Sequence, residues 1–472
     1  MLRTRHFYYL KISYNFNAQK GRQEIFMKLI YDVNDKPKFG QLLVFAFQQL
    51  LAILAATIAV PSIIGNGMSQ SAALFGAGVG TIVYLLFTKF KSPVFLGSSF
   101  AFLGSMFAAF AGAVSVEAGH AGLIIGAIFA GLVYVVIAIV VKFAGVKWID
   151  KLMPPVVIGP TVAIIGLSLS GNAIGDMLKF AEFDAANSVY VMGAKGWVGL
   201  ICALVTLLTV MICSVYGKKM TKLIPFIIGI LAGYAVAAIF TVIGIKTGND
   251  NFMVIDFSLF NNMQWYPDFT FFKAKEGFAA VDAKYIATVA VAYVPVAFVV
   301  FAEHIADHKN LSSVIDRELL KEPGLHRTLL GDGVGSMVGA FFGGCPNTTY
   351  GESVGCVAIT GNASVVTILT TAIMAILISF FGPFVTFLAT IPSCVMGGVC
   401  VTLYGFIAVS GLKMLQTVDL NDNSNLFVVS AILISGIGGM ALKLGQVTLT
   451  EIACALILGI IVNLILSKKA SE

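Results

Sequence analysis

The sequence predicts an all-α polytopic membrane protein, and two observations indicate that fold class. Of the 472 residues, 58% are hydrophobic and 11% are charged, whereas soluble domains carry about 25% charged residues. Apolar runs of about 20 residues recur from residue 40 to residue 467, and each can cross a hydrocarbon core about 30 Å thick. The lipid bilayer is therefore expected to surround most of the chain.

The apolar runs divide into about fourteen segments, of which two look too short or too broken to span a membrane alone. The segments cover residues 40–62, 70–88, 95–112, 119–141, 153–175, 196–215, 223–245, 285–306, 328–343, 348–361, 363–388, 391–412, 425–442 and 448–467.

Positive charge indicates how the segments are oriented. Lys and Arg gather in every second connection, and the positive-inside rule places those connections in the cytoplasm. Both termini are then expected in the cytoplasm, namely the polar segment over residues 1–38 and the tail over residues 468–472. The basic residues of the other cytoplasmic connections are Lys89, Lys91, Lys142, Lys147, Lys151, Lys218, Lys219, Lys222, Lys309, Arg317, Lys321, Arg327 and Lys413.

Neither nucleic-acid binding nor a disulfide or zinc site is expected from this sequence. The 30 Lys and Arg residues are dispersed among the loops rather than gathered in one basic patch, which argues against nucleic acid. The seven cysteines lie in or beside apolar segments without CxxC spacing, so we expect free thiols rather than a disulfide framework or a zinc site.

The two halves of the chain repeat a pattern. Met153-Pro-Pro-Val-Val-Ile-Gly159 matches Ile391-Pro-Ser-Cys-Val-Met-Gly397 at an offset of 238 residues. The glycine-broken stretch Leu96-Gly-Ser-Ser-Phe100 in the third segment corresponds to Thr349-Tyr-Gly-Glu-Ser353 in the tenth. Seven segments per half, an odd number, predict repeats that are inverted across the membrane. Interrupted segments at matching places in such repeats are the best sequence indicator of a transporter's substrate site.

The interrupted stretch of the second half predicts part of that site. It reads Gly343-Gly-Cys-Pro-Asn-Thr-Thr-Tyr-Gly-Glu352-Ser-Val-Gly355 inside an otherwise apolar sequence. Non-helical backbone at membrane depth is tolerated where protein or a water-filled cavity satisfies its polar groups. A carboxylate there costs about 2.5–3.5 kcal/mol on insertion scales, so Glu352 is interpreted as functional. The alternative is a pair of helix kinks with capping residues.

A second acidic cluster ends the segment over residues 285–306. It reads Glu303-His304-Ile-Ala-Asp307-His308. Glu303 and Asp307 share one helix face, and the two histidines share the adjacent face. A carboxylate in a low dielectric, with a histidine one turn away, has the composition of a proton-coupling site. The alternative is a hydrated carboxylate near the cytoplasmic end of the helix.

The spacing of His304 and His308 also fits two zinc ligands on one helix face. A metalloprotease helix would place a glutamate directly after the first histidine, where this chain has Ile305. A third ligand of suitable type is not found nearby, so neither a metal nor another cofactor is expected.

The chemistry of these stretches indicates the class of substrate. Helix N-terminal N–H groups favour a carbonyl oxygen, carboxylates accept N–H groups, and the ring of Phe100 can stack on a flat ligand. Such a set suits a small, neutral, planar solute with alternating C=O and N–H groups. Because the site carries two glutamates and no intramembrane cation, it suits a simple anion poorly.

These motifs resemble the nucleobase/ascorbate transporter family, and within it most closely the bacterial uracil permeases. The resemblance covers about residues 28–467, and the run Pro346-Asn-Thr-Thr-Tyr-Gly-Glu352 is highly specific to that branch. The motifs that carry the resemblance are Gln48-Gln49-Leu50, Leu96-Gly-Ser-Ser-Phe-Ala-Phe102, Ala302-Glu-His304 with His308, Pro323-Gly-Leu-His-Arg327, Pro346 to Glu352, and Gly355-x4-Thr360.

The resemblance implies a core domain and a gate domain. The core would combine residues 39–145 and 285–388, and the gate would combine residues 146–284 and 389–467. Segments three and ten would each contain a short strand that pairs with the other in the middle of the membrane. Family members often form homodimers through their gate domains, which is the expectation for this chain.

The resemblance also implies roles for individual residues. Glu303 and Glu352 would accept the ring N–H groups of the substrate, and the backbone amides of Phe100 and Gly351 would meet its carbonyls. His308 would take part in proton linkage together with the two glutamates. The other residues expected at the substrate are Ser99, Tyr350 and Tyr404.

Two positions depart from the family pattern. Ser353 replaces the asparagine of the signature, and Gln49 replaces a histidine that is common after Gln48. Both positions bear on affinity and on the hydrogen-bond network. Glutamate at position 352, rather than the glutamine of xanthine and urate carriers, favours uracil.

We therefore predict a proton-coupled uracil importer of the bacterial cytoplasmic membrane that works by alternating access and is not an enzyme. Its coupling ion would be H+, with no cofactor. One alternative is a xanthine or other purine symporter of the same fold. A passive channel for small neutral solutes is another, and a membrane hydrolase is less favoured because it would need a nucleophile–base pair or a metal cluster.

Overall fold

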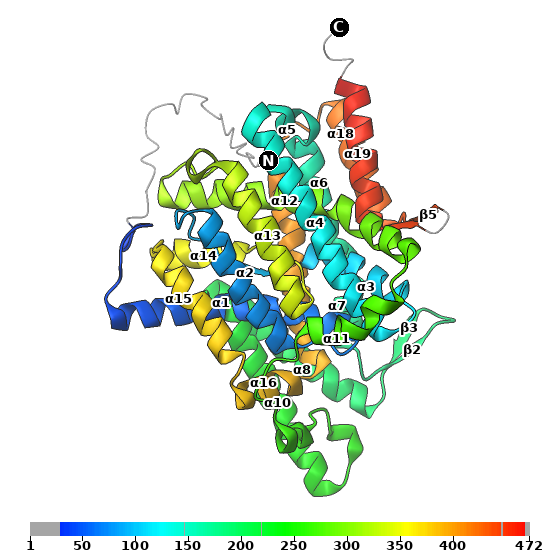
Figure 1. Cartoon of the computed structure of the whole chain (residues 1–472). Coiled ribbons are helices and arrows are strands. Elements are labelled where there is room, and N and C mark those ends of the chain that lie inside the picture. Colours follow the sequence, from blue (N-terminus) through cyan, green and yellow to red (C-terminus); the bar gives the residue numbers. More distant parts are fainter. Residues whose placement is uncertain (1–28, 146, 219, 445–446, 468–472) are drawn as a thin grey trace, which may run out of the picture.

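The computed structural model describes residues 29–145, 147–218, 220–444 and 447–467 (Figure 1). The expected cytoplasmic tail and most of the expected N-terminal segment lie outside these residues. The described chain is almost entirely helical, with three short two-stranded sheets. The predicted all-α class is confirmed.

The first half of the chain folds into ten helices and three strands. Their bounds are α1 Phe39–Ile64, α2 Gln70–Phe87, β1 Leu96–Ser98, α3 Leu103–Ala111, α4 Val116–Ala144, α5 Lys147–Leu152, α6 Pro155–Ser168, α7 Ser170–Met177, β2 Glu182–Asp184, β3 Val189–Val191, α8 Ala194–Tyr216, α9 Met220–Leu223 and α10 Pro225–Thr247.

The second half follows a long connection that contains α11. The bounds are α11 Thr270–Gly277, α12 Ala283–Ile315, α13 Leu325–Gly343, β4 Asn347–Thr349, α14 Gly351–Thr360, α15 Val365–Ile378, α16 Gly382–Thr390, α17 Ser393–Leu415, α18 Asn423–Ile437, β5 Leu442–Leu444, β6 Val447–Leu449 and α19 Glu451–Ser467.

The predicted count of fourteen spans is not confirmed. Within the described residues, eight helices are long and apolar enough to cross a membrane, and α15 with α16 would make a ninth span bent by 83°. Several other predicted segments consist of shorter pieces, such as α3, α14, α18 and α19. The third and tenth segments are short because each begins as a strand and becomes a helix only afterwards.

The predicted strands in the third and tenth segments are confirmed, and they pair with each other. β1 and β4 run antiparallel, with Gly97 opposite Thr348 at the centre of the pair. All six residues are buried. Because lipid offers no hydrogen bonds, unwound backbone at this depth needs such a partner. The outer edge of β1 is also satisfied, since its Leu96 N–H donates to the Thr81 hydroxyl of α2 at 2.9 Å.

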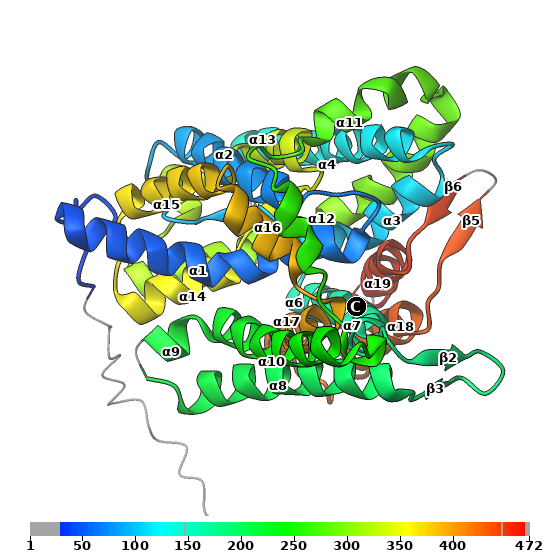
Figure 2. The ribbon, with the colours of Figure 1, turned by 90° about the horizontal axis from the view of Figure 1, so that it is seen from below.

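The helices form two layers, which Figure 2 shows edge-on. One layer contains α1–α4 and α12–α15, and the other contains α6–α10 and α17. The packing partners repeat between the two halves of the chain: α2 packs on α15 as α13 packs on α4, and α6 packs on α18 as α17 packs on α8. This is the pattern expected of the predicted repeat, whose inversion across the membrane and whose domain boundaries stay predictions.

Small residues bring α2 and α13 into direct backbone contact. A Cβ built at Gly335 would lie 2.8 Å from the Gly80 carbonyl oxygen, and a Cβ at Gly80 would lie 2.7 Å from the Gly335 carbonyl oxygen. Helices in membranes associate through such close van der Waals packing. The α2–α13 contact lies directly behind the paired strands, because both helices contact β1.

We therefore expect Gly335→Ala to destabilise the protein. The added methyl group cannot fit without moving one helix backbone, and overpacking of this kind costs about 1–3 kcal/mol. The measurement is the thermal unfolding midpoint of the detergent-solubilised protein. Gly405→Ala on α17 is the matched control, because nothing lies within 4 Å of its added Cβ. An equal midpoint for the two variants would contradict the proposed close contact.

Candidate functional site

A cavity of about 430 Å³ lies between the two layers. Ligand pockets in proteins have volumes of about 300–1,000 Å³, so the space suits a small molecule. Its wall on the first layer comes from α12 and α14, and its opposite wall comes from α10 and α17. The apolar side chains of that opposite wall include Phe226, Leu403, Phe406 and Ile407.

The structure brings three of the predicted site residues together on one wall of this cavity. Glu303 comes from α12, whereas Gly351 and Glu352 form the first turn of α14. The first N–H groups of a helix have no carbonyl partner within it, so this turn offers donors beside two carboxyl groups. Acceptors and donors for a small polar solute therefore meet on one surface.

The sequence left two interpretations of Glu303, a cavity residue or a hydrated carboxylate near a helix end. The length of α12 distinguishes them. The sequence predicted a segment that ends at residue 306, which would place Glu303 one turn from the helix terminus. The helix continues to Ile315. Glu303 is half-buried in the cavity wall, so the reading as a solvated helix end is wrong.

Asp307 is a cavity residue that the predicted site did not include. It lies one turn beyond Glu303 on the same face of α12 and also lines the cavity. The Thr349 hydroxyl of β4 donates a hydrogen bond of 2.8 Å to its carboxylate. The i,i+4 spacing from Glu303 was the signal that could have placed it there.

Phe95, immediately before β1, fixes the backbone on both sides of Gly351 and Glu352. Its carbonyl accepts the Tyr350 N–H at 3.2 Å, and its own N–H donates to the Ser353 hydroxyl at 3.1 Å. Gly351 and Glu352 therefore lie between two residues, Tyr350 and Ser353, that both form hydrogen bonds with the backbone of Phe95. The residue before β1, in the other half of the chain, thus helps to position Glu352.

The two departures from the family pattern contact each other. The side-chain amide of Gln49 on α1 donates to the Ser353 hydroxyl at 2.5 Å. Both side chains are buried, at 3% and 0% exposure. The hydroxyl of Ser353 thus joins α1, α14 and the residue before β1, and the residue types at positions 49 and 353 have to be understood together.

Four predicted site residues lie behind the cavity wall. The Tyr350 hydroxyl donates to the Ser98 carbonyl at 2.8 Å. The ring of Phe100 meets the ring of Tyr404 edge-on, with centroids 5.7 Å apart, and both rings are buried. Ser99 is also buried, and its N–H donates to the Pro346 carbonyl. In this conformation none of the four lines the cavity, and their contacts with a substrate stay predictions.

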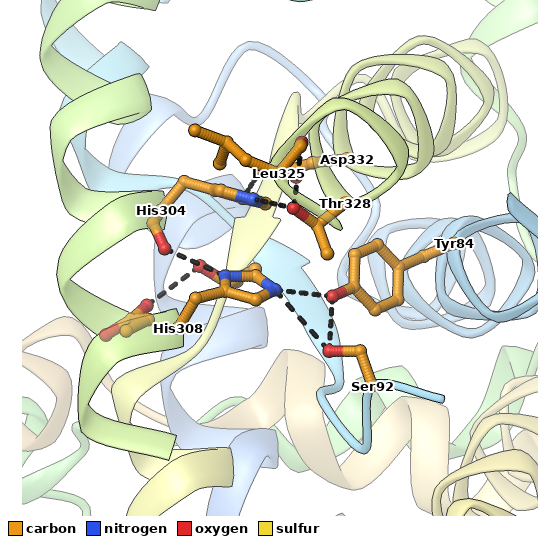
Figure 3. Close-up of polar contacts among 9 residues, drawn as sticks. Tyr84, Ser92, His304, His308, Leu325, Thr328 and Asp332 are labelled. Carbon is orange, nitrogen blue, oxygen red and sulfur yellow. Dashed lines mark hydrogen bonds and ion pairs between the residues drawn. The ribbon is translucent and has the colours of Figure 1, made fainter. Parts of the chain in front are cut away.

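His308 does not line the cavity either, and Figure 3 shows its ring directed toward Tyr84 and Ser92. Its Nδ1 lies 2.8 Å from the His304 carbonyl oxygen, and its Nε2 lies 2.7 Å from the Tyr84 hydroxyl. The residue that lies one turn after Glu303 on the cavity face of α12 is Asp307. A part for His308 in proton linkage stays a prediction, and it would have to act through the helix or through Tyr84.

The rings of His304 and His308 have different partners. Their rings lie 4.1 Å apart, and all four ring nitrogens already have hydrogen-bonding partners within the core. His304 contacts Asp332 and Thr328 of α13, whereas His308 contacts Tyr84 of α2. The rings are therefore directed toward different helices rather than toward a shared ligand.

The rim of the cavity is polar. Lys222, Asn310 and Ser410 line it and are exposed. They lie close in sequence to the Lys- and Arg-rich connections that the positive-inside rule assigns to the cytoplasm. The cavity therefore opens toward the basic end of the protein, whereas Phe100 and Tyr404 pack against each other deeper between the layers.

We expect the contact between Gln49 and Ser353 to contribute to stability. Ser353→Ala leaves the Phe95 N–H and the Gln49 amide without a partner, which costs about 1–3 kcal/mol. In a double-mutant cycle with Gln49→Ala, the two losses should be less than additive, with a coupling of about 0.5–1.5 kcal/mol. The measurement is thermal unfolding in detergent.

The control for this cycle is Thr161→Val, since the Thr161 hydroxyl is buried but bonds only within its own helix, to the Val157 carbonyl. Strict additivity of the two alanine substitutions would show that the side chains do not interact.

Comparisons with known proteins identify a family and relatives that cover most of the chain. The sequence profile of a family described as "Permease family" matches residues 40–445. The chain is 38% identical over 444 residues to a uracil permease of Bacillus caldolyticus, covering 93% of this chain and 95% of that protein. It is 36% identical over 451 residues to a uracil permease of Bacillus subtilis (94% and 97%) and 33% identical over 437 residues to one of Escherichia coli (92% and 93%).

Solved structures support the fold. The transmembrane domain of the cyanobacterial bicarbonate transporter BicA matches with a TM-score of 0.58 at 17% identity, covering 92% of this chain and all of that domain. SLC26A9 matches with a TM-score of 0.64 at 11% identity, covering 92% of this chain and 67% of that protein. At these identities the likeness concerns the fold alone.

Proposed function

This chain belongs to the permease family whose profile it matches, and from that premise we propose that it imports uracil together with protons by alternating access. It is a multi-pass membrane transporter of the nucleobase type. The proposal assigns it to the bacterial cytoplasmic membrane with both termini inside. It also includes a homodimer formed through the layer of α8 and α10, whose outer faces expose large apolar side chains.

The convergence of Glu303 and Glu352 on one cavity wall is the observation that supports the substrate best. Uracil is a flat neutral ring with two N–H groups and two carbonyls. Two carboxyl groups can accept the ring N–H groups, and the first N–H groups of α14 can meet a carbonyl oxygen. The relatives named uracil permease point to the same base.

The three carboxyl groups of the cavity favour proton coupling. Glu303, Asp307 and Glu352 all line one small space, and carboxylates that share a site disfavour each other's ionisation. In the described part of the chain, none of the three takes part in a salt bridge with Lys or Arg. A proton that enters with uracil would relieve this repulsion, with Glu303 as its carrier in the proposal.

The position of the cavity suits alternating access. It is open at the basic end of the protein, whereas the contact between Phe100 and Tyr404 joins the two layers beyond it. A movement of one layer against the other would open that contact and close the rim at Lys222. A passive channel would instead need a continuous opening past these two rings.

We expect Glu303→Gln and Glu352→Gln to abolish uracil uptake. Glu352→Gln removes a charge-assisted hydrogen bond worth about 1.5–3 kcal/mol, equivalent to about a 10–150-fold loss of affinity. Glu303→Gln removes the carboxyl group that carries the proton in the proposal. The measurement is radiolabelled uracil uptake into proteoliposomes. Glu276→Gln is the matched control, because Glu276 is exposed on α11, outside the cavity. Normal uptake by the Glu303 variant would overturn the proposed mechanism.

We also expect an inward proton gradient to drive uracil accumulation. In proteoliposomes, an imposed pH gradient should raise internal uracil above its external concentration, and a protonophore should abolish the effect. Accumulation that follows a sodium gradient instead would show that Na+, and not H+, is the coupling ion. Equilibration without accumulation would favour a channel.

Competition by unlabelled bases distinguishes a uracil carrier from a xanthine or other purine carrier of the same fold. In the same assay, excess uracil should compete with labelled uracil, whereas xanthine should compete at least about tenfold less well, because rejecting an imperfectly hydrogen-bonded ligand is worth 1.4 kcal/mol or more. Stronger competition by xanthine would assign the chain to purine transport.

A further inference from the structure

Behind the cavity wall, α12 and α13 are joined by a buried pair of titratable side chains that the proposed site does not use (Figure 3). His304 Nδ1 lies 2.7 Å from Asp332 Oδ2, and His304 Nε2 lies 3.0 Å from the Thr328 hydroxyl. His304 is fully buried and Asp332 is 1% exposed. His304 directly follows Glu303, so helix geometry turns it toward α13 while Glu303 faces the cavity.

The hydrogen-bond distances fit two arrangements of this pair, which differ by one proton. In the first arrangement the Thr328 hydroxyl donates to the Leu325 carbonyl at 3.0 Å, and a carbonyl can only accept. Thr328 then accepts its other bond from His304 Nε2–H. A neutral imidazole protonated on Nε2 has a bare Nδ1, which cannot lie 2.7 Å from a bare carboxylate oxygen without a proton between them.

We propose that His304 and Asp332 form a second proton-binding site, separate from the substrate cavity and linked to the charge of Glu303. In the first arrangement the pair holds the shared proton and has no net charge. When one proton leaves, the Thr328 hydroxyl turns from the Leu325 carbonyl to donate to Nε2, and Nδ1–H donates to the Asp332 carboxylate. The pair then carries one negative charge.

The surroundings connect this charge to the cavity. The titratable groups that interact electrostatically with the pair are Glu303, Asp307 and His308 on α12, Tyr84 on α2 and Tyr134 on α4. Glu352 on α14 interacts in turn with Glu303 and Asp307. In the described chain, the one salt bridge recorded for Asp332 is to His304. Two negative charges in this region would repel each other. A negative charge on Glu303 therefore favours the protonated pair, and loss of the proton from the pair favours a protonated Glu303.

An unpartnered polar atom of the pair also favours a site that changes state. Asp332 Oδ1 is buried without a hydrogen-bond partner in the described structure. Buried polar groups are normally satisfied. The second carboxylate oxygen of Asp332 thus retains an unused acceptor, which would be needed when the pair becomes negative.

The inference rests on the proposed proton-coupled transport, and Asp332→Asn tests it. Asparagine keeps a hydrogen bond to His304 but cannot hold the shared proton. We expect the number of protons bound with each uracil, measured by calorimetry in buffers of different ionisation enthalpy, to change between about pH 5 and 8. The pH midpoint of uptake should shift by about one unit. Unchanged proton numbers and an unchanged midpoint would mean that the pair is only structural.

Thr328 provides a matched pair of variants in case Asp332→Asn does not fold. Thr328→Val removes the hydroxyl that exchanges partners and should shift the pH midpoint, whereas Thr328→Ser retains the hydroxyl and should keep the wild-type profile. A purely structural hydroxyl would lower the unfolding temperature of the valine variant without moving its pH midpoint, and that result would overturn the proposal.

A spectroscopic measurement separates this inference from the proposed function. The chain has five histidines, so ¹⁵N resonances of the full-length protein can be assigned by single substitutions. We expect His304 to be protonated on Nε2 at neutral pH and to exchange to the Nδ1–H form as pH rises. A permanent Nδ1–H form would overturn the proton site even if wild-type protein couples uracil to protons. Failure of wild-type coupling alone would overturn the proposed function instead.

Discussion

The structure depends on hydrogen bonds to the backbone N–H and C=O groups of the non-helical segments in the middle of the membrane. β1 and β4 supply that satisfaction to each other, although about 250 residues separate them, because an isolated strand in lipid would leave its N–H and C=O groups unpaired. The arrangement extends beyond the ladder through Thr81, Phe95 and Ser353, which bind the remaining backbone groups at its edges. Gly351 and Glu352 follow β4 directly, and Asp307 accepts a hydrogen bond from Thr349 of that strand.

Consecutive residues of α12 separate two kinds of chemistry. Glu303 and Asp307 face the cavity, whereas His304 and His308 face the interior of the same layer. The 100° turn between neighbours on a helix causes this separation. The carboxyl groups can meet a solute and water, while the imidazoles are fixed by hydrogen bonds to α13 and α2. Proton-active groups on both faces of one helix allow the charge on one face to influence the other.

Close packing explains why the layer behind the site is rigid enough to position it. Gly80 and Gly335 allow the backbones of α2 and α13 to touch, and both helices support β1. The opposite layer meets the site through apolar side chains such as Leu403 and Phe406. Tight packing within a layer and a looser contact between layers are what a movement of one against the other requires.

The sequence by itself determined the membrane class, the two interrupted segments and the acids in them, because apolar length, glycine breaks and buried charge are local properties of the chain. It did not determine how many segments cross as complete helices, since strand formation at Leu96 and Asn347 depends on a partner in the other half. The i,i+4 spacing already put Asp307 on one helix face with Glu303. Only the tertiary structure showed that this face meets the cavity and that Gln49 contacts Ser353. Those facts depend on the rotation of α12 and on the approach of distant helices, which no local pattern encodes.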